Sequence, residues 1–154
     1  MTFLTTKLVL TIGIPGSGKS SWVERYAKEH PEAVVVSTDG IRKEVTGTSE
    51  CQPCQSRRIH EIARARVRKL MEEGKPLIVV DSTNTELREW REYWLLGARE
   101  TEGHVFDISA EEGERRQAGR ERKVPSYAIH LKYDELQRNK RYMKFFFDTI
   151  IYEV

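Results

Sequence analysis

The residues with the clearest chemical meaning form a glycine-rich turn near the start of the chain. The segment Gly13-Ile14-Pro15-Gly16-Ser17-Gly18-Lys19-Ser20 matches the pattern Gly-x-x-x-x-Gly-Lys-[Ser/Thr] at every defined position. Glycines lack the Cβ atoms that would keep backbone N–H groups away from phosphate oxygens, and a helix that follows adds unpaired donors. The pattern predicts a phosphate-binding loop made by Gly13, Pro15, Gly16, Ser17, Gly18, Lys19 and Ser20.

Two side chains of this turn suggest the ligand. Lys19 is expected to place its ammonium between the β- and γ-phosphates, and the Ser20 hydroxyl is expected to bind Mg²⁺. The sequence therefore predicts ATP, or another purine nucleoside triphosphate, together with Mg²⁺.

A carboxylate and a guanidinium follow the second apolar run of the chain. Asp39 comes shortly after residues 33–36, and Arg42 lies one helical turn beyond it. Ligands of open α/β sheets bind beyond the carboxyl ends of the strands. Asp39 is therefore the candidate general base for a hydroxyl nucleophile, with a helix N-cap as the alternative. Arg42 is the candidate for holding a phosphate of the acceptor.

A second carboxylate, Asp81, closes the apolar run of residues 77–80. An acidic residue in this position typically holds the Mg²⁺ shell, although aspartate also favours strand-end turns.

Arginines are concentrated in two segments. Arg116 and Arg120 lie four residues apart, which predicts one face of a helical lid over the triphosphate at about residues 110–125. A merely solvated basic helix is the alternative. The arginines of residues 57–69 are interpreted as solvated helix surface.

Apolar runs alternate with helical patterns along the chain. Strands are expected at residues 8–12, 33–36, 77–80 and 104–108, with a fifth at 148–154. Helices are expected from the glycine-rich turn to residue 30 and over 56–73, 86–99, 111–119 and 126–141. This alternation predicts an α/β fold of three layers with a parallel sheet of four to five strands.

Composition sets broader limits. The chain has 154 residues, the size of one domain, and 32% of them are charged. No apolar run approaches the roughly 20 residues needed to cross a bilayer, and no signal-peptide pattern is present, so the cytoplasm is the expected compartment. Cys51 and Cys54 are interpreted as two thiols in a loop rather than as a metal or redox pair.

The order of the motifs resembles one enzyme family. Gly-x-Pro-Gly-Ser-Gly-Lys-Ser, Asp-x-x-Arg, Asp-x-Thr-Asn and Arg-x-x-x-Arg before Val-Pro follow one another as in the kinase module of phage and bacterial polynucleotide 5′-hydroxyl kinases. The similarity runs from about residue 7 to 142. It implies an adenylate-kinase-like P-loop fold with a tunnel that admits the 5′ end of a strand.

The resemblance also implies roles for single residues. Lys19 and Ser20 match the phosphate and magnesium residues, Asp39 the general base and Arg42 the residue on the acceptor phosphate. The lid arginines that engage ATP phosphates correspond to Arg116 and Arg120. The strand-end motif corresponds to residues 81–84, which puts Thr83 and Asn84 on the substrate side. Because the acidic residue can sit one position later in phage relatives, the contact to Mg²⁺ stays open between Asp81 and its neighbours.

The function expected from these residues is transfer of the ATP γ-phosphate to the 5′-hydroxyl end of DNA or RNA in end repair. Two alternatives remain: a kinase of a nucleoside, sugar or other small alcohol, and a nucleotide-binding module without turnover. The tryptophans Trp22, Trp90 and Trp94 are expected in the core rather than in a base-stacking platform.

Overall fold

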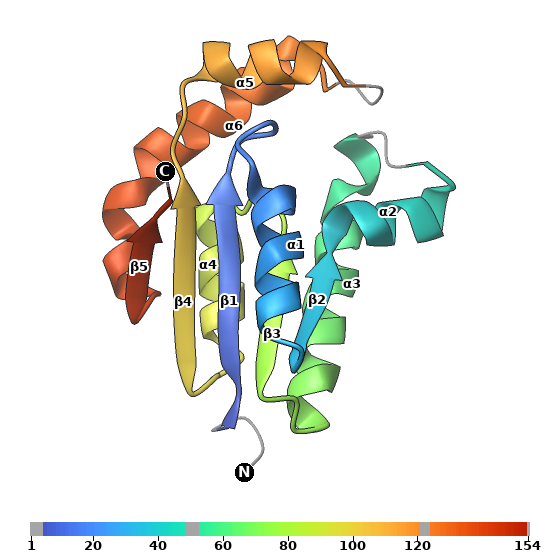
Figure 1. Cartoon of the computed structure of the whole chain (residues 1–154), viewed down its shortest axis with the longest axis vertical. Helices are drawn as coiled ribbons and strands as arrows, with labels where there is room; N and C mark the ends of the chain where they lie inside the picture. The colour runs from blue at the N-terminus through green and yellow to red at the C-terminus, as the bar shows by residue number, and fades with distance from the viewer. Residues whose placement is uncertain (1–4, 49–52, 121–123, 154) are drawn as a thin grey trace.

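Five parallel strands form a single sheet in the order β2-β3-β1-β4-β5 (Figure 1). The computed structural model describes residues 5–48, 53–120 and 124–153. The strands are β1 Lys7–Gly13, β2 Ala33–Ser37, β3 Leu77–Asp81, β4 Glu100–Phe106 and β5 Thr149–Tyr152. The predicted parallel sheet is confirmed, including its fifth strand.

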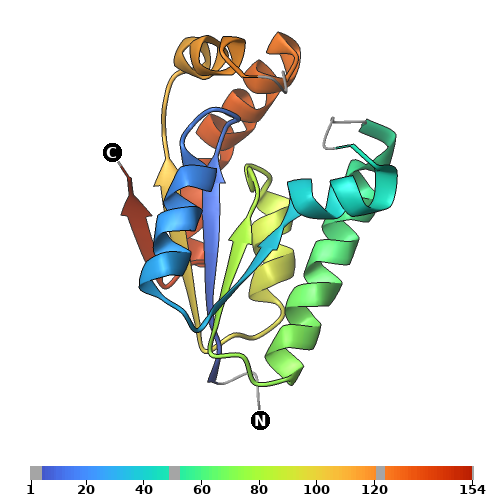
Figure 2. The same ribbon diagram turned by 45° about the vertical axis from the view of Figure 1, so that its right-hand side comes forward.

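Helices cover both faces of the sheet, so the fold has the three expected layers (Figures 1 and 2). One face is covered by α1, and the other by α3, α4 and α6. The helices are α1 Lys19–Glu29, α2 Thr38–Thr46, α3 Pro53–Glu72, α4 Leu87–Trp94, α5 Ala110–Ala118, α6 Ser126–Asn139 and the short 3₁₀ helix η2 Lys140–Phe145.

The side chains of β1 explain why the central strand is apolar throughout. Leu8, Leu10 and Ile12 point to the face covered by α3, α4 and α6, and Val9 points to α1. All four are fully buried. Successive residues of a strand face opposite sides, so a strand buried on both faces is an uninterrupted apolar run.

Helix α2 was not predicted. Its first residues show whether Asp39 is a helix N-cap, the alternative to the general base. The Ser37 hydroxyl accepts a hydrogen bond from the Gly40 N–H at 3.2 Å, which makes Ser37 the N-cap. Asp39 therefore lies in the first turn, and the N-cap interpretation of this residue is wrong. The helix ends at Gly47, whose φ of 81° is the left-handed conformation that glycine tolerates.

Several boundaries differ from those expected. Strand β4 was expected at residues 104–108 but covers Glu100–Phe106. Its polar start is buried because Glu102 pairs with Lys7 at 3.3 Å and with His104 at 3.1 Å. Helix α4 is shorter than expected, and Gly97, with a φ of 76°, follows its end.

The expected loop around the two cysteines is wrong for one of them. Helix α3 begins at Pro53, so the backbone of Cys54 lies in its first turn. Cys51 lies outside the described residues, as does part of the expected lid, residues 121–123.

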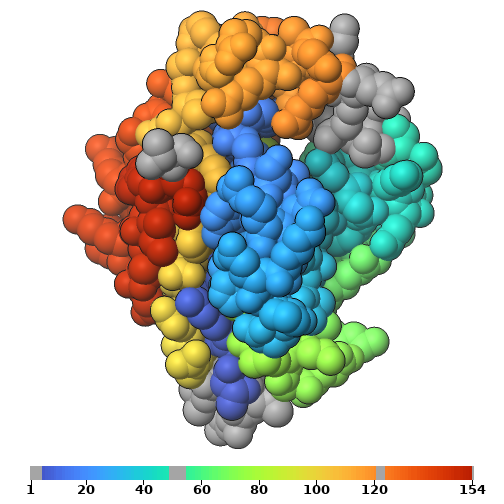
Figure 3. Space-filling view, in the orientation of Figure 1, coloured from blue at the N-terminus to red at the C-terminus, as the bar shows by residue number. Residues whose placement is uncertain are grey.

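The carboxyl ends of the strands meet at one end of the molecule, between two groups of helices. Helices α5 and α6 stand on one side of this end, and α2 and the start of α3 stand on the other (Figure 2). The space-filling view shows an opening between α5 in orange and α2 in blue-green (Figure 3). Across the described ranges, no helix has both the length and the apolar character that a bilayer crossing requires.

The tryptophans allow a direct test of core packing. The Trp90 side chain is fully buried, and its indole Nε1–H donates to the Asn84 carbonyl at 2.6 Å. We expect Trp90→Phe to lower the free energy of unfolding by about 1 to 2 kcal/mol, since it leaves a buried acceptor without its donor. Urea unfolding of the variant measures this change.

Trp94 provides the matched control for this test. It ends the same helix and contacts Phe146 edge to face, but its side chain is half exposed, so the expected core position is wrong for Trp94. Trp94→Phe should change the unfolding free energy by less than about 0.5 kcal/mol. Equal effects of the two substitutions would contradict the assignment of Trp90 as the core tryptophan of α4.

Candidate active site

A cavity of about 420 Å³ occupies the end of the sheet between the two groups of helices. Its walls come from the glycine-rich turn, α2, α3, the end of β3, α4, the end of α5 and α6. Most of the residues predicted from the sequence lie on these walls: Pro15, Gly16, Gly18, Lys19, Ser20, Asp39, Arg42, Asp81, Thr83 and Arg120.

The backbone of the glycine-rich turn, residues 13–20, has the form that phosphate binding needs. Gly16 and Gly18 have φ values of 86° and 96°, and Gly18 is the N-cap of α1. No side chain caps this helix, and a Cβ atom built on Gly18 would meet nothing within 4 Å. The first N–H groups of α1 therefore have no side-chain cap at the positive end of the helix dipole, which suits a turn that binds phosphate.

Gly13 and Ser17 support the turn from below. Gly13 N–H donates to the Thr83 carbonyl at 2.9 Å, and a Cβ atom on Gly13 would lie 2.7 Å from the Ser17 hydroxyl. Both residues hold the shape of the turn without lining the cavity.

Lys19 lies at the centre of the turn. Its ammonium donates to the Ile14 carbonyl at 2.8 Å and to the Ser17 hydroxyl at 3.3 Å. Burial lowers the pKa of Lys19 to about 8, although the charges of Asp81 and Asp39 act in the opposite direction. Both of these acceptors are uncharged. Phosphate oxygens would give this buried ammonium a negatively charged acceptor.

Asp81 and Ser20 form a pair of oxygen donors beside Lys19. Burial raises the pKa of Asp81, while the Lys19 charge and a hydrogen bond with Ser20 oppose that rise. Mg²⁺ prefers a few hard oxygen ligands and keeps the rest of its shell as water and phosphate oxygens. The two side chains fit this requirement, so Ser20 and Asp81 would hold Mg²⁺ here.

Asp39 and Arg42 lie on the α2 wall of the same cavity. The Arg42 guanidinium donates to Asp39 Oδ1 at 2.7 Å. The Arg42 side chain is only 7% exposed, whereas that of Asp39 is 50% exposed. Arg42 therefore holds the carboxylate from the buried side of this wall.

Hydroxyl groups fix this wall relative to the sheet. Thr38 donates to the Ser82 hydroxyl at 3.0 Å, and Thr11 of β1 donates to the Ser82 carbonyl at 3.0 Å. These bonds connect α2, the end of β3 and the middle of β1. They set Asp39 and Asp81 at fixed positions relative to the turn that follows β1.

Helix α5 packs directly on the glycine-rich turn. The Gly113 carbonyl lies 2.9 Å from a Cβ atom built on Gly16, and Arg116 donates to the Gly16 carbonyl at 3.1 Å. Arg116 also donates to Glu112 at 2.9 Å and does not line the cavity. Of the two predicted lid arginines, Arg120 is on the cavity wall and Arg116 clamps the turn.

Asn84 does not take the predicted place on the substrate side. It is buried, with a φ of 45°, and its amide donates to the Thr11 carbonyl at 2.8 Å. Its own carbonyl accepts from Trp90. Asn84 thus joins the end of β3 to β1 and α4, whereas Thr83 beside it lines the cavity.

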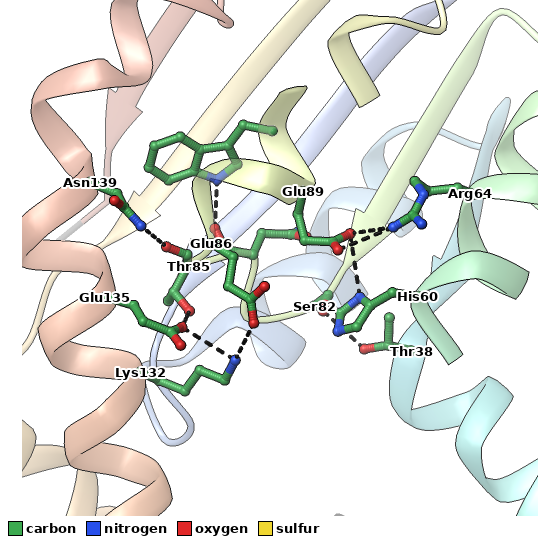
Figure 4. Close-up of polar contacts among 12 residues, drawn as sticks. Thr38, His60, Arg64, Ser82, Thr85, Glu86, Glu89, Lys132, Glu135 and Asn139 are labelled. Carbon is green, nitrogen blue, oxygen red and sulfur yellow. Dashed lines mark hydrogen bonds and ion pairs between the residues drawn. The ribbon is translucent and has the colours of Figure 1, made fainter. Parts of the chain in front are cut away.

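Two ionic groups on the cavity wall were missed by the sequence analysis (Figure 4). In the first, Arg64 of α3 donates to both oxygens of the buried Glu89 of α4, at 3.1 and 3.0 Å. In the second, Lys132 of α6 lies 3.3 Å from both Glu86 and Glu135.

The sequence held a weak signal for the first group. His60 and Arg64 lie four residues apart on the helix expected over 56–73, next to its apolar stripe. The partner Glu89 lies on another helix, and nothing in the sequence connects the two helices. The interpretation of residues 57–69 as solvated surface is therefore wrong for Arg64, whose side chain is 16% exposed.

Comparison with known families classifies the chain. A model of the AAA domain family matches residues 8–144. The chain belongs to this family. Its fold is that of the P-loop kinases, with the nucleotide-binding loop after β1.

Solved structures give the same fold. One chain from "the Pnkp1/Rnl/Hen1 RNA repair complex" is 27% identical, with a TM-score of 0.76 over 90% of this chain and 46% of that one. A second, from a "Pnkp1/Rnl/Hen1 complex", is 27% identical, with a TM-score of 0.63 over 79% of this chain and 41% of that one. This chain thus spans less than half the length of these two chains.

A gluconokinase from Sinorhizobium meliloti 1021 matches at lower identity. It is 15% identical, with a TM-score of 0.66 over 97% of this chain and 82% of that one. At this identity the match shows the fold alone.

The contact between α5 and the phosphate-binding loop leads to a test. A Cβ atom on Gly113 would lie 2.7 Å from Ile14 Cδ1 and 3.1 Å from the Pro15 carbonyl. We expect Gly113→Ala to push α5 off the loop and to weaken ATP binding about tenfold, a cost typical of overpacking. Isothermal titration calorimetry with ATP and Mg²⁺ measures the change.

Gly119→Ala is the matched control, because a Cβ atom there would meet nothing within 4 Å. It should leave the ATP affinity within about twofold. Unchanged affinity in Gly113→Ala would show that nucleotide binding does not depend on the packing of α5.

Proposed function

We propose that the protein is an ATP-dependent kinase that phosphorylates the 5′-hydroxyl end of a nucleic-acid strand. One observation carries the proposal: Asp39 of α2 and Lys19 of α1 line the same cavity, and their charges are close enough to interact. A hydroxyl acceptor that enters between them would meet a base on one side and the γ-phosphate on the other.

The transfer step follows from these positions. Asp39 takes the proton of the acceptor hydroxyl as its oxygen bonds to the γ-phosphorus. The bond between that phosphorus and the β,γ-bridging oxygen breaks, and the electron pair leaves with ADP. Ser20 and Asp81 would hold Mg²⁺, which would supply positive charge next to the phosphate oxygens.

The basic residues divide between donor and acceptor. Lys19 and Arg120 would contact the phosphates of ATP, where guanidinium charge stabilises the transferring group. Arg116 would support them through its bond to the loop. Arg42, beside Asp39, would hold the phosphate that follows the first nucleoside of the acceptor strand.

Nucleic acid is proposed as the acceptor on two grounds. The motifs of this chain resemble those of polynucleotide 5′-hydroxyl kinases, and two similar chains come from complexes named for RNA repair or for the same three proteins. Basic side chains also outnumber acidic ones on the cavity wall, as a polyanionic acceptor requires.

A small alcohol such as a nucleoside or sugar is the second candidate. The volume of about 420 Å³ lies in the range of pockets for small ligands. An acceptor panel separates the two candidates. Labelled ATP is offered with 5′-hydroxyl DNA and RNA oligonucleotides, single nucleosides and sugars. Label on oligonucleotides supports the proposal, whereas label on small alcohols alone overturns it.

Asp39→Asn tests the base. We expect kcat to fall by about 100-fold or more, because general-base catalysis contributes factors of this size. The ATP affinity should stay within about threefold, since the phosphate-binding loop is unchanged. Steady-state kinetics and calorimetry measure the two quantities.

Glu44→Gln is the control for Asp39→Asn. Glu44 lies on the same helix α2 but forms an exposed pair with Arg66 at 2.5 Å, outside the cavity. Its substitution should leave kcat unchanged. Full activity of Asp39→Asn would remove Asp39 from the mechanism.

Arg120→Ala tests the donor side of the cavity. We expect kcat to fall by roughly 10³-fold, the lower end of the effect of an arginine on a transferring phosphoryl group. The acceptor KM should change little. A rise in the acceptor KM without a fall in kcat would assign Arg120 to the acceptor instead.

A further inference from the structure

The ionic group of Glu89, Arg64 and His60 has no part in the transfer step described above, yet it forms a wall of the same cavity. Glu89 comes from α4, and Arg64 and His60 come from successive turns of α3. The Glu89 side chain is 7% exposed, and both of its oxygens accept from Arg64. Arg64 therefore fixes the position of this carboxylate through both of its oxygens.

Glu89 faces one nitrogen of the His60 ring. Nδ1 of His60 is buried and lies 3.6 Å from Glu89 Oε2, and within the described ranges it has no closer partner (Figure 4). The separation is longer than a hydrogen bond, but the Glu89 oxygens already accept from Arg64 and favour a proton on the His60 nitrogen that faces them. Nδ1–H toward Glu89 leaves Nε2 with a free lone pair.

The protonation state of His60 supports the same assignment. Burial lowers the pKa of His60, with Glu89 opposing this change and the charges of Lys132 and Arg42 adding to it. The imidazole is therefore neutral near pH 7, with one donor and one acceptor nitrogen. A neutral ring on a cavity wall otherwise rich in cations offers a hydrogen-bond acceptor.

We propose that Nε2 of His60 accepts a hydrogen bond from a hydroxyl or amine of the acceptor molecule, next to its reacting hydroxyl. Glu89 is the positioning residue for His60, and Arg64 is the positioning residue for Glu89. The inference rests on the proposed function and names one chemical feature that the acceptor must carry.

The position of His60 places this contact on the acceptor side. His60 lies on α3, which packs against α2, the helix that carries Asp39 and Arg42. It is close enough to Arg42 for the two charges to interact. The phosphate-binding loop, by contrast, follows β1 and packs under α5.

A nucleic-acid end has two groups that could donate to His60. One is the ribose 2′-hydroxyl, which lies beside the phosphate assigned to Arg42 and is present only in RNA. The other is an exocyclic amine of the terminal base. Both offer the same chemistry, so the experiment must separate them.

Two substitutions of His60 test the contact. His60→Leu keeps an apolar side chain of moderate size but removes the acceptor atom, and His60→Gln places an amide oxygen at a similar reach. We expect His60→Leu to raise the acceptor KM about tenfold, the effect of one lost hydrogen bond, without changing the KM for ATP. His60→Gln should recover most of the loss.

The acceptor strands identify the donor. Matched 5′-hydroxyl RNA strands carry either ribose or 2′-deoxyribose at the first nucleotide. Each of the two is made with adenine as the terminal base and with unsubstituted purine, which lacks the exocyclic amine. If the 2′-hydroxyl is the partner, its removal raises the wild-type KM about tenfold but has no effect in His60→Leu. If the amine is the partner, replacing adenine by purine raises the wild-type KM about tenfold and has no effect in His60→Leu.

Double substitution tests the positioning role. Glu89→Met should raise the acceptor KM in the wild-type background but add nothing in the His60→Leu background, since its effect passes through His60. Arg68→Ala, an exposed α3 residue outside the cavity, is the control and should leave every constant unchanged. Thermal melting of each variant verifies that it is folded.

The outcomes separate the two proposals. If wild-type protein labels no oligonucleotide, the proposed function itself fails. If wild type labels them and folded His60→Leu keeps the wild-type acceptor KM, or loses affinity for ATP and acceptor equally, the inference about His60 is wrong while the proposed function stands. The inference is also wrong if removing the 2′-hydroxyl and removing the amine each change the acceptor KM equally in wild type and in His60→Leu.

Discussion

Three hydroxyl side chains hold the catalytic end of this molecule together. Thr11, in the middle of β1, bonds to the backbone at the end of β3, and the same segment presents Ser82 to Thr38 at the start of α2. Buried hydroxyls must be paired, and pairing across three elements leaves one relative position for them. Because Asp39 follows Thr38 and Asp81 precedes Ser82, both carboxylates take their places from these bonds. The phosphate-binding loop follows β1 and shares the same frame.

The second constraint is parallel pairing in the sheet. β1 lies between β3 and β4, and all three run in the same direction. Their carboxyl ends therefore open at one edge, where the loop, Asp81 and the start of α5 meet. α5 then closes the edge through the contact of Gly113 with Gly16. The cavity thus results from strand order combined with one close helix-to-loop contact.

Much of this arrangement could be predicted because it depends on local pattern. The apolar runs of the strands, the glycine-rich turn and the carboxylates after β2 and β3 are all visible in short segments. The failures involve contacts between distant segments. The residues before His104 are mostly polar, so the start of β4 was missed; Glu102 is buried there because it pairs with Lys7 and His104. Asn84 resembled a ligand contact but bonds to Thr11, 73 positions away. Arg64 resembled solvated surface because its partner Glu89 lies on another helix.

The charges of the cavity are divided in a way that suits a two-substrate reaction. Within the described residues, Lys19 and Arg120 form no ion pair with a carboxylate, so their charge is available to a triphosphate. Arg42, Arg64 and Lys132 are each paired with an acidic side chain. Each pair holds its cation in one position, so the acceptor side would present fixed donors to a phosphate of the strand. A neutral hydroxyl is better recognised by oriented dipoles than by mobile charge. The same pairs therefore also hold Asp39 and Glu89 in place, and with them the two groups that would face the incoming alcohol, Asp39 and His60.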